Sequence, residues 1–160
     1  MATQNTYSDS MAAAFVGMVA NTEPNNLISR TVETSAGIGF GVPVQQGTAD
    51  NECKVMAAGA TECVGITVRD QSTTADTFAE GDSALLIRQG VIWATVTDAG
   101  GVVAGDPVWV KLADGTFSNA DVGSDGSIKL AGCRWDSTAA NAALAKIRVD
   151  LDVPAVLGAS

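Results

Sequence analysis

The stretch EGDSALLIRQGVIWATVTDAGGVVAGDPVWVKLADGTF, residues 80–117, carries a Gly-Asp pair at each of two equivalent places. Gly81-Asp82 precedes the apolar residues 84–87, and Gly105-Asp106 precedes the apolar residues 108–110. Glycine supplies positive φ and aspartate accepts hydrogen bonds from nearby amides, so each pair is a good turn. The apolar runs favour strands. The stretch therefore predicts two turn-then-strand units around a third strand at residues 91–97, together a compact antiparallel β module.

Short strands are predicted along the rest of the chain as well. Residues 27–34 and 128–135 are typical of strands, and Asp114-Gly115 is a hairpin signal. In residues 64–69 and again in residues 145–153, apolar and polar side chains alternate, as in a sheet with one buried face. Roughly nine short strands with polar loops between them predict an all-β fold. We expect a small antiparallel β-barrel or sandwich, jelly-roll- or tulip-like, with an extended N-terminal arm.

Residues 36–44 have glycine at every second position before Pro43. The spacing is G-x-G-x-G rather than the G-x-G-x-x-G of dinucleotide-binding folds, and Pro43 excludes the helix that those folds need. We expect a strand in which one face carries only glycines. Pro43 has no N–H to donate to a neighbouring strand, so the segment should lie on a sheet edge or at a bulge.

The composition excludes several classes of function. The 160 residues carry a net charge of −9, and the nine Lys and Arg residues are scattered singly. Nucleic-acid binding needs a basic footprint, so the charge argues against it. Three widely spaced cysteines do not suggest a secreted disulfide framework and favour a reducing cytosol.

The N-terminal residues contain an apolar run at 11–20, which is too short to span a bilayer. No Lys or Arg precedes it, which disfavours a signal peptide. Ser10 is a suitable cap for a short helix through Ala20, and Pro24 would end any helix. An apolar patch of this size either folds onto its own domain or docks on a partner.

The residues of catalytic and metal sites are missing or wrongly spaced. There is no histidine, which removes Ser-His-Asp and Cys-His catalysis and the usual zinc ligand sets. The cysteines lack C-x-x-C spacing, and no phosphate-binding loop motif occurs. Residues 121–132 lack two ligands of a calcium loop, including the final Glu. We expect no enzyme, no cofactor and no metal.

The tryptophans Trp93, Trp109 and Trp135 each lie in a predicted strand. Buried tryptophans would serve a barrel core or a subunit interface, whereas exposed ones would serve a carbohydrate platform. Trp109 shares its strand side with Lys111, so we expect it to face outward or toward a partner.

Seven segments of the chain form a recognisable series: GFGVPVQQGT (39–48), VGITVRD (64–70), FAEGD (78–82), RQGVIWATV (88–96), AGDPVWV (104–110), GCRWD (132–136) and AKIR (145–148). In this order and spacing they resemble the capsid cement or decoration proteins of tailed phages. The similarity covers about residues 36–150. It implies a small β-barrel protein on the outside of an icosahedral head, usually a homotrimer, that bridges major capsid protein subunits. The implied location is the virion's outer capsid surface, after assembly in the host cytoplasm, with no nucleic acid or membrane as partner.

From the residues and the resemblance together we divide the chain into an N-terminal arm at 1–35, a short helix or extended, and a β-barrel cement domain at 36–160. The arm is the expected docking element for a partner. The interface candidates are the apolar residues of the arm and the outward tryptophan: Met11, Phe15, Val16, Met18, Leu27, Ile28 and Trp109. A carbohydrate- or receptor-binding β module on a virion is the alternative function.

Overall fold

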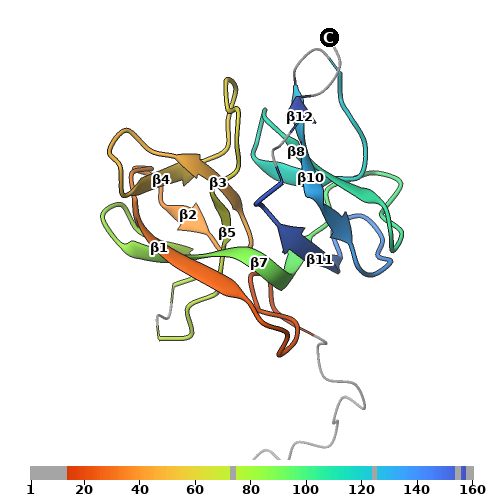
Figure 1. The fold of residues 1–160 in the computed structure, drawn as a ribbon, viewed down its shortest axis with the longest axis horizontal. Coiled ribbons are helices and arrows are strands. Elements are labelled where there is room, and N and C mark those ends of the chain that lie inside the picture. The colour runs from red at the N-terminus through yellow and green to blue at the C-terminus, as the bar shows by residue number, and fades with distance from the viewer. Residues whose placement is uncertain (1–13, 73–74, 124–125, 154–155, 158–160) are drawn as a thin grey trace, which may run out of the picture.

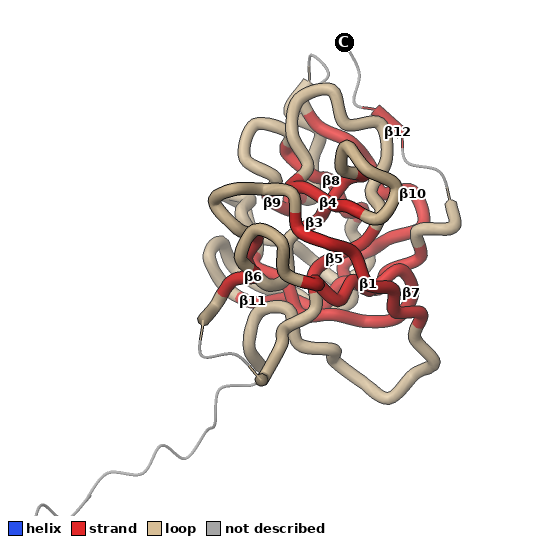
Figure 2. Tube along the Cα trace, turned by 90° about the vertical axis from the view of Figure 1, so that its left-hand side faces the viewer, coloured by secondary structure: helices blue, strands red, loops and turns tan. Residues whose placement is uncertain are grey.

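The computed structural model describes residues 14–72, 75–123, 126–153 and 156–157. Within these residues every regular element is a strand, so the all-β prediction is confirmed, and none of them forms a helix that could cross a membrane (Figure 2). The strands are β1 (Asn26–Val32), β2 (Ile38–Gly39), β3 (Pro43–Gln46), β4 (Glu52–Val55), β5 (Gly65–Thr67), β6 (Thr77–Phe78), β7 (Ser83–Thr95), β8 (Pro107–Lys111), β9 (Thr116–Ser118), β10 (Ser127–Trp135), β11 (Leu144–Asp150) and β12 (Val156–Leu157).

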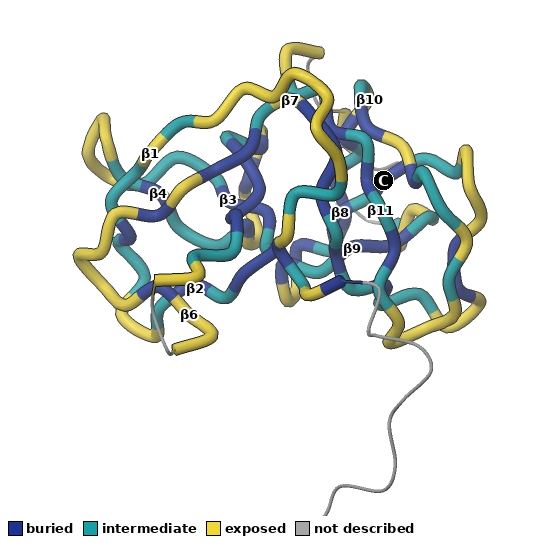
Figure 3. Tube along the Cα trace, turned by 90° about the horizontal axis from the view of Figure 1, so that it is seen from below, coloured by how far each residue is buried: buried dark blue, intermediate teal, exposed yellow. Residues whose placement is uncertain are grey.

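Two small barrels share the long strand β7 (Figure 1). In the first barrel, β1, β4, β3, β5 and the first half of β7 pair in a closed ring, in which only the β1–β4 pair is parallel. In the second barrel, the other half of β7 continues through β11, β10, β8 and β9. That barrel closes where Val96, just after β7, bridges Phe117 of β9. Viewed from below, the two barrels lie side by side and exposed residues gather on the outer loops (Figure 3).

The buried apolar residues form two clusters, one inside the first barrel and a larger one that fills the second barrel and also includes Ile66 and Ile87 of the first. The first is filled by side chains that include Val32, Val44 and Leu86, and Phe40 packs edge-on against Phe78 with ring centroids 5.1 Å apart. The second core is larger and contains the fully buried Trp135, which packs edge-on against Phe117. Such edge-to-face pairs stabilise by about 0.5–1.5 kcal/mol beyond the area they bury.

The two Gly-Asp turns predicted from the sequence have the same geometry. Gly81 and Gly105 have φ values of 84° and 99°, a region that residues with a Cβ rarely adopt. In both turns the aspartate Oδ2 accepts a hydrogen bond from the amide three residues earlier, at 2.8 Å for Asp82 and 2.9 Å for Asp106. The two turns therefore have the same backbone conformation and the same closing hydrogen bond.

Both turns also dock on a neighbouring strand in the same way. Gly81 donates its amide hydrogen to the Val32 carbonyl, and the Val32 amide donates to the Asp82 carbonyl. Gly105 and Asp106 form the same pair of bonds with Trp135. The first turn therefore ties β7 to the end of β1, and the second ties β8 to the end of β10.

Three sequence expectations were wrong in detail. The two strands expected at 84–87 and 91–97 are one strand, β7, of 13 residues. The single strand expected at 36–44 is split into β2 and β3 by a turn at Gly41. Pro43 is the first residue of β3, which lies between β4 and β5 and not on an edge. A strand's first position tolerates proline, because no ladder bond from its nitrogen is needed there.

The N-terminal part differs from a detached arm where it is described. Residues 14–20 contain a turn and a bridge from Val19 to Ile92 of β7, and no helix. The rest of the expected helix, residues 10–13, lies outside the described residues. The strand predicted at 27–34 is β1, which pairs with β7 along six residues. The division of the chain at residue 35 stays a prediction.

We expect Asp82→Ala and Asp106→Ala each to lower the free energy of unfolding by about 1 kcal/mol, because each removes a hydrogen bond that closes its turn. For a domain of this size that is a melting-temperature drop of roughly 2–4 °C. Glu80→Ala, in the exposed part of the first turn, is the control and leaves the melt unchanged. Equal melts for all three variants would contradict the role given to the aspartates.

Candidate interaction surfaces

The potential metal ligands and thiols are scattered or buried in the part of the chain that the structure describes. No group of three or more His, Cys, Asp or Glu there is placed to hold a metal ion. The cysteines are free and buried, and burial raises the pKa of Cys53 and Cys133 to about 11 and that of Cys63 to about 12. At neutral pH these thiols are protonated and pack as small apolar groups.

The N-terminal residues are anchored to the domain by a close backbone crossing. Gly17 and Gly41 face each other, and a Cβ on Gly17 would lie 2.8 Å from the Gly41 nitrogen. Gly17 donates a hydrogen bond to the Trp93 carbonyl at 2.8 Å, and Ala20 donates to the Val91 carbonyl at 2.8 Å. Residues 17–20 thus pair with the edge of β7.

An arginine lies between two aromatic rings beside this anchor. The Arg69 guanidinium carbon is 5.2 Å from the centroid of Phe15 and 5.1 Å from that of Phe40. Arg69 also forms an ion pair with Asp76 at 3.1 Å. Phe15 is 59% exposed and Met18 is 37% exposed, so the anchor presents two large apolar side chains to the surroundings.

A second exposed apolar pair lies on the outer side of the first barrel. Leu27 of β1 and Leu85 of β7 are each 39% exposed, and next to them along the same strands Ser29 and Ser83 share a hydroxyl hydrogen bond of 3.0 Å. Ile28, the next residue of β1, packs against the core instead. Alternation along the strand explains this difference, since successive side chains point to opposite faces.

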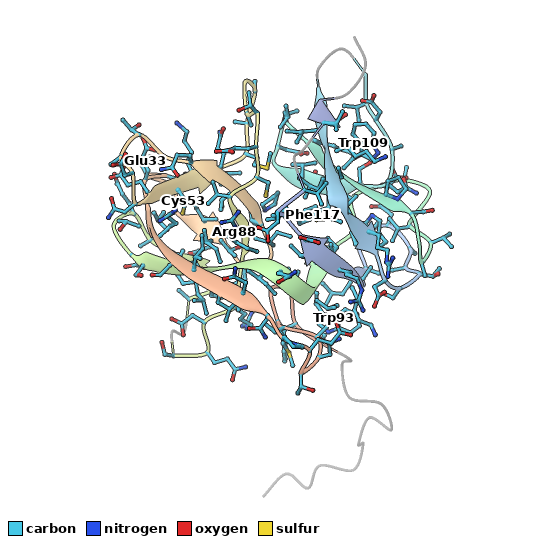
Figure 4. The ribbon with its side chains drawn as sticks, in the orientation of Figure 1. Glu33, Cys53, Arg88, Trp93, Trp109 and Phe117 are labelled. Carbon is cyan, nitrogen blue, oxygen red and sulfur yellow. The ribbon has the colours of Figure 1, made fainter. Side chains whose placement is uncertain are left out.

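The other sequence-derived interface candidates fall in different places. Val16 is partly buried against the first core, and Met11 lies outside the described residues. Trp109 is partly buried on the second barrel, and the Lys129 ammonium of the opposite strand lies 6.0 Å from its ring centroid. Trp93 pairs in the same way with Lys146 at 5.5 Å, at the other end of that barrel (Figure 4). The structure therefore brings Phe15, Met18 and Leu27 to the surface but does not gather all the candidates into one patch.

The segment before β1 is tied to β11 by an exposed ion pair. Both nitrogens of the Arg148 fork donate to the Glu23 carboxylate, at 2.9 and 3.1 Å. These hydrogen bonds hold the pKa of Glu23 below its usual range, and they raise the pKa of Arg148. The pair fixes residues near Pro24 against the second barrel.

A groove between the two barrels is a feature that sequence reasoning missed. It measures about 290 Å³ and is lined by Arg30, Gln46, Glu62 and Arg88 from the first barrel and by Leu130 and Leu151 from the second. Arg88 lies between the barrels in Figure 4. The sequence gives no signal for the groove, because the spacing within a strand does not reveal which distant strands will face it.

Comparison with known proteins gives one family and a similar fold. Residues 3–150 match the sequence model of the family described as structural cement protein (E217 gp24/Pam3 gp6). A chain from the capsid of Myoviridae phage XM1 is 23% identical and superposes with a TM-score of 0.73, covering 94% of this chain and 98% of that one. The head fiber gp8.5 N base of bacteriophage phi29 is 11% identical, with a TM-score of 0.42 and coverage of 79% of this chain and 94% of that one. A search of curated proteins gave no match.

We expect Gly17→Ala to detach residues 14–20 from β7, because the new methyl group would lie 2.7 Å from the Phe40 Cβ and 2.8 Å from a backbone nitrogen. Hydrogen exchange at the Ala20 amide measures this and should accelerate at least about tenfold. Gly59→Ala is the matched control, since Gly59 also has positive φ (86°) but a Cβ there meets nothing within 4 Å. If the Ala20 amide exchanged at the same rate in both variants, the close crossing at Gly17 would not be what holds residues 17–20 on β7.

The Glu23–Arg148 pair predicts a small pH effect of definite sign. A carboxyl whose folded-state pKa is lowered contributes stability above its unfolded pKa and loses it as pH falls through the folded pKa. We therefore expect the melting difference between the wild type and Arg148→Gln to shrink as pH falls from 6 to 3. In an NMR titration, Arg148→Gln should move the Glu23 pKa up toward its ordinary value of about 4.3. An unchanged Glu23 midpoint would contradict this.

Proposed function

Because this chain belongs to the structural cement protein family of phages, we propose that it binds the outer surface of an icosahedral head and stabilises contacts between major capsid protein subunits. The observation that carries the proposal is the family match, which extends over residues 3–150 and so includes both barrels and the N-terminal anchor. Family membership makes the chain a structural protein of the phage virion. The contact with the major capsid protein, the homotrimer and assembly in the host cytoplasm are parts of the proposal.

The surface features are compatible with binding by a preformed shape. Two barrels joined by a shared, well-packed apolar cluster offer a rigid body, and rigid partners lose little conformational entropy on binding. Phe15 and Met18 at the anchor, together with Leu27 and Leu85, offer the apolar side chains that interfaces bury. In this proposal residues 1–13 extend the contact from the fixed point at Gly17 to a neighbour.

The alternative, a carbohydrate- or receptor-binding module, receives no support from the tryptophans. Sugar platforms use open indole faces, but Trp93 and Trp109 each have a lysine ammonium from the paired strand near the ring. Such cation–π contacts at exposed sites stabilise by about 0.5–1 kcal/mol each. Trp135 is fully buried.

The experiment mixes purified protein with undecorated heads and measures bound copies per head by sedimentation and gel densitometry. We expect saturable binding by the wild type and loss of occupancy, by at least about tenfold in affinity, for a chain lacking residues 2–13. That deletion keeps Gly17 and the strands, so its melt should match the wild type within roughly 2–4 °C. Leu85→Asp tests the second apolar site in the same assay.

A wild type that does not bind heads would refute the proposed function. Binding that survives the deletion unchanged would refute the role of residues 1–13 while leaving the function standing. Light scattering of the free protein tests the homotrimer separately, and a mass of one chain at micromolar concentration would contradict it.

A further inference from the structure

Arg30 lies in the groove between the barrels without an acidic partner. It projects from β1, and no acid among the described residues forms an ion pair with it. The chain has 18 Asp and Glu but only nine Lys and Arg, so acids are abundant. Arginine is almost never fully buried unless it is paired, and even partial burial of its guanidinium costs desolvation energy. An unpaired, half-buried arginine in an acidic protein calls for an explanation.

Arg88 reaches the same groove from a β-bulge. The register between β1 and β7 shifts there, with Asn26 opposite Gln89 and Leu27 opposite Ile87, so Arg88 has no partner residue in β1. Bulges of this kind redirect a side chain. Asp152 approaches Arg88 at 3.6 Å and is 70% exposed, while Glu62 lines the groove as a second acid.

The Nε atoms of both arginines are buried and donate no hydrogen bond to any described group. Buried donors in proteins are almost always paired, so an orphaned one is informative. Because Nε is buried, the Nη atoms at the end of each guanidinium are the donors left to meet a carboxylate, which they bind in two parallel bonds. Two such donor sets thus line one groove, and the apolar wall from Leu130 and Leu151 strengthens any charge interaction there.

We propose that the groove between the barrels, through Arg30 and Arg88, binds a carboxylate side chain of the shell protein on which this chain sits. The inference rests on the proposed function and adds a chemical recognition site to it. Charge complementarity selects the occupant: in a protein of net charge −9, this groove offers two guanidiniums where an acidic residue of the shell would otherwise be repelled. In the free protein the unpaired charge of Arg30 lowers stability, and that charge is paired when the carboxylate binds.

The test compares Arg30→Gln and Arg30→Lys with the control Arg134→Gln on undecorated heads. Arg134 is an exposed arginine of β10 with no ion pair among the described residues, so its substitution removes the same charge elsewhere. We expect Arg30→Gln to weaken head binding at least about tenfold, the effect of removing one partner of a buried charge pair. Arg30→Lys should fall between it and the wild type, because it keeps the charge without the fork. Arg134→Gln should stay within about twofold.

Thermal melts of the free proteins separate binding from structure. Arg30→Gln should melt at or above the wild-type temperature, because it removes an unpaired charge from a partly buried place. A lower melt restored by Arg30→Lys would make Arg30 structural and overturn the inference. Wild-type binding by Arg30→Gln would overturn it while the proposed function stood. A change in the free protein's light-scattering mass without a change in head binding would show a second copy of this chain as the occupant, and would also overturn it.

Discussion

The structure depends on β7 belonging to two barrels at once. Its first half pairs with β1 and β5, and its second half pairs with β11. A strand of 13 residues is longer than most, and here the length is required because neither barrel closes without it. The bulge at Arg88 and the positive φ of Gly90 lie at the change of partners. The groove between the barrels is a direct consequence of this sharing.

The same constraint explains why the Gly-Asp turn occurs twice. In each barrel the chain must turn sharply just before a strand, and the turn must be hydrogen-bonded to the end of a neighbouring strand. A turn whose glycine amide and aspartate carbonyl bond to one residue of that neighbour meets both needs. The aspartate carboxylate meanwhile satisfies an amide of the turn itself. In these two turns the aspartates are structural.

Local signals in the sequence were sufficient for much of the fold. The turns at Gly81 and Gly105, the hairpin at Asp114-Gly115 and the alternation in β11 are all determined by residues close in the chain. β7 appeared as two strands because Gly90 interrupts its apolar pattern, and a glycine inside a strand looks the same as a break until its partners are known. β4, with the sequence ECKV, has too few apolar residues to be recognised without its neighbours β1 and β3.

The candidate sites were less predictable, for a physical reason. Exposure of Phe15, Met18 and Leu27 agrees with a role at an interface, but Ile28 and Val16 look equally apolar in the sequence and pack inward. The pairing of β1 with β7 decides which face of β1 is covered, and that pairing joins residues more than 50 positions apart. Arg30 shows this most clearly, since in the sequence it is an ordinary polar residue of a strand. Arg30 becomes a half-buried, unpaired charge only when the first barrel packs against the second. That environment is what makes it a candidate for binding a carboxylate.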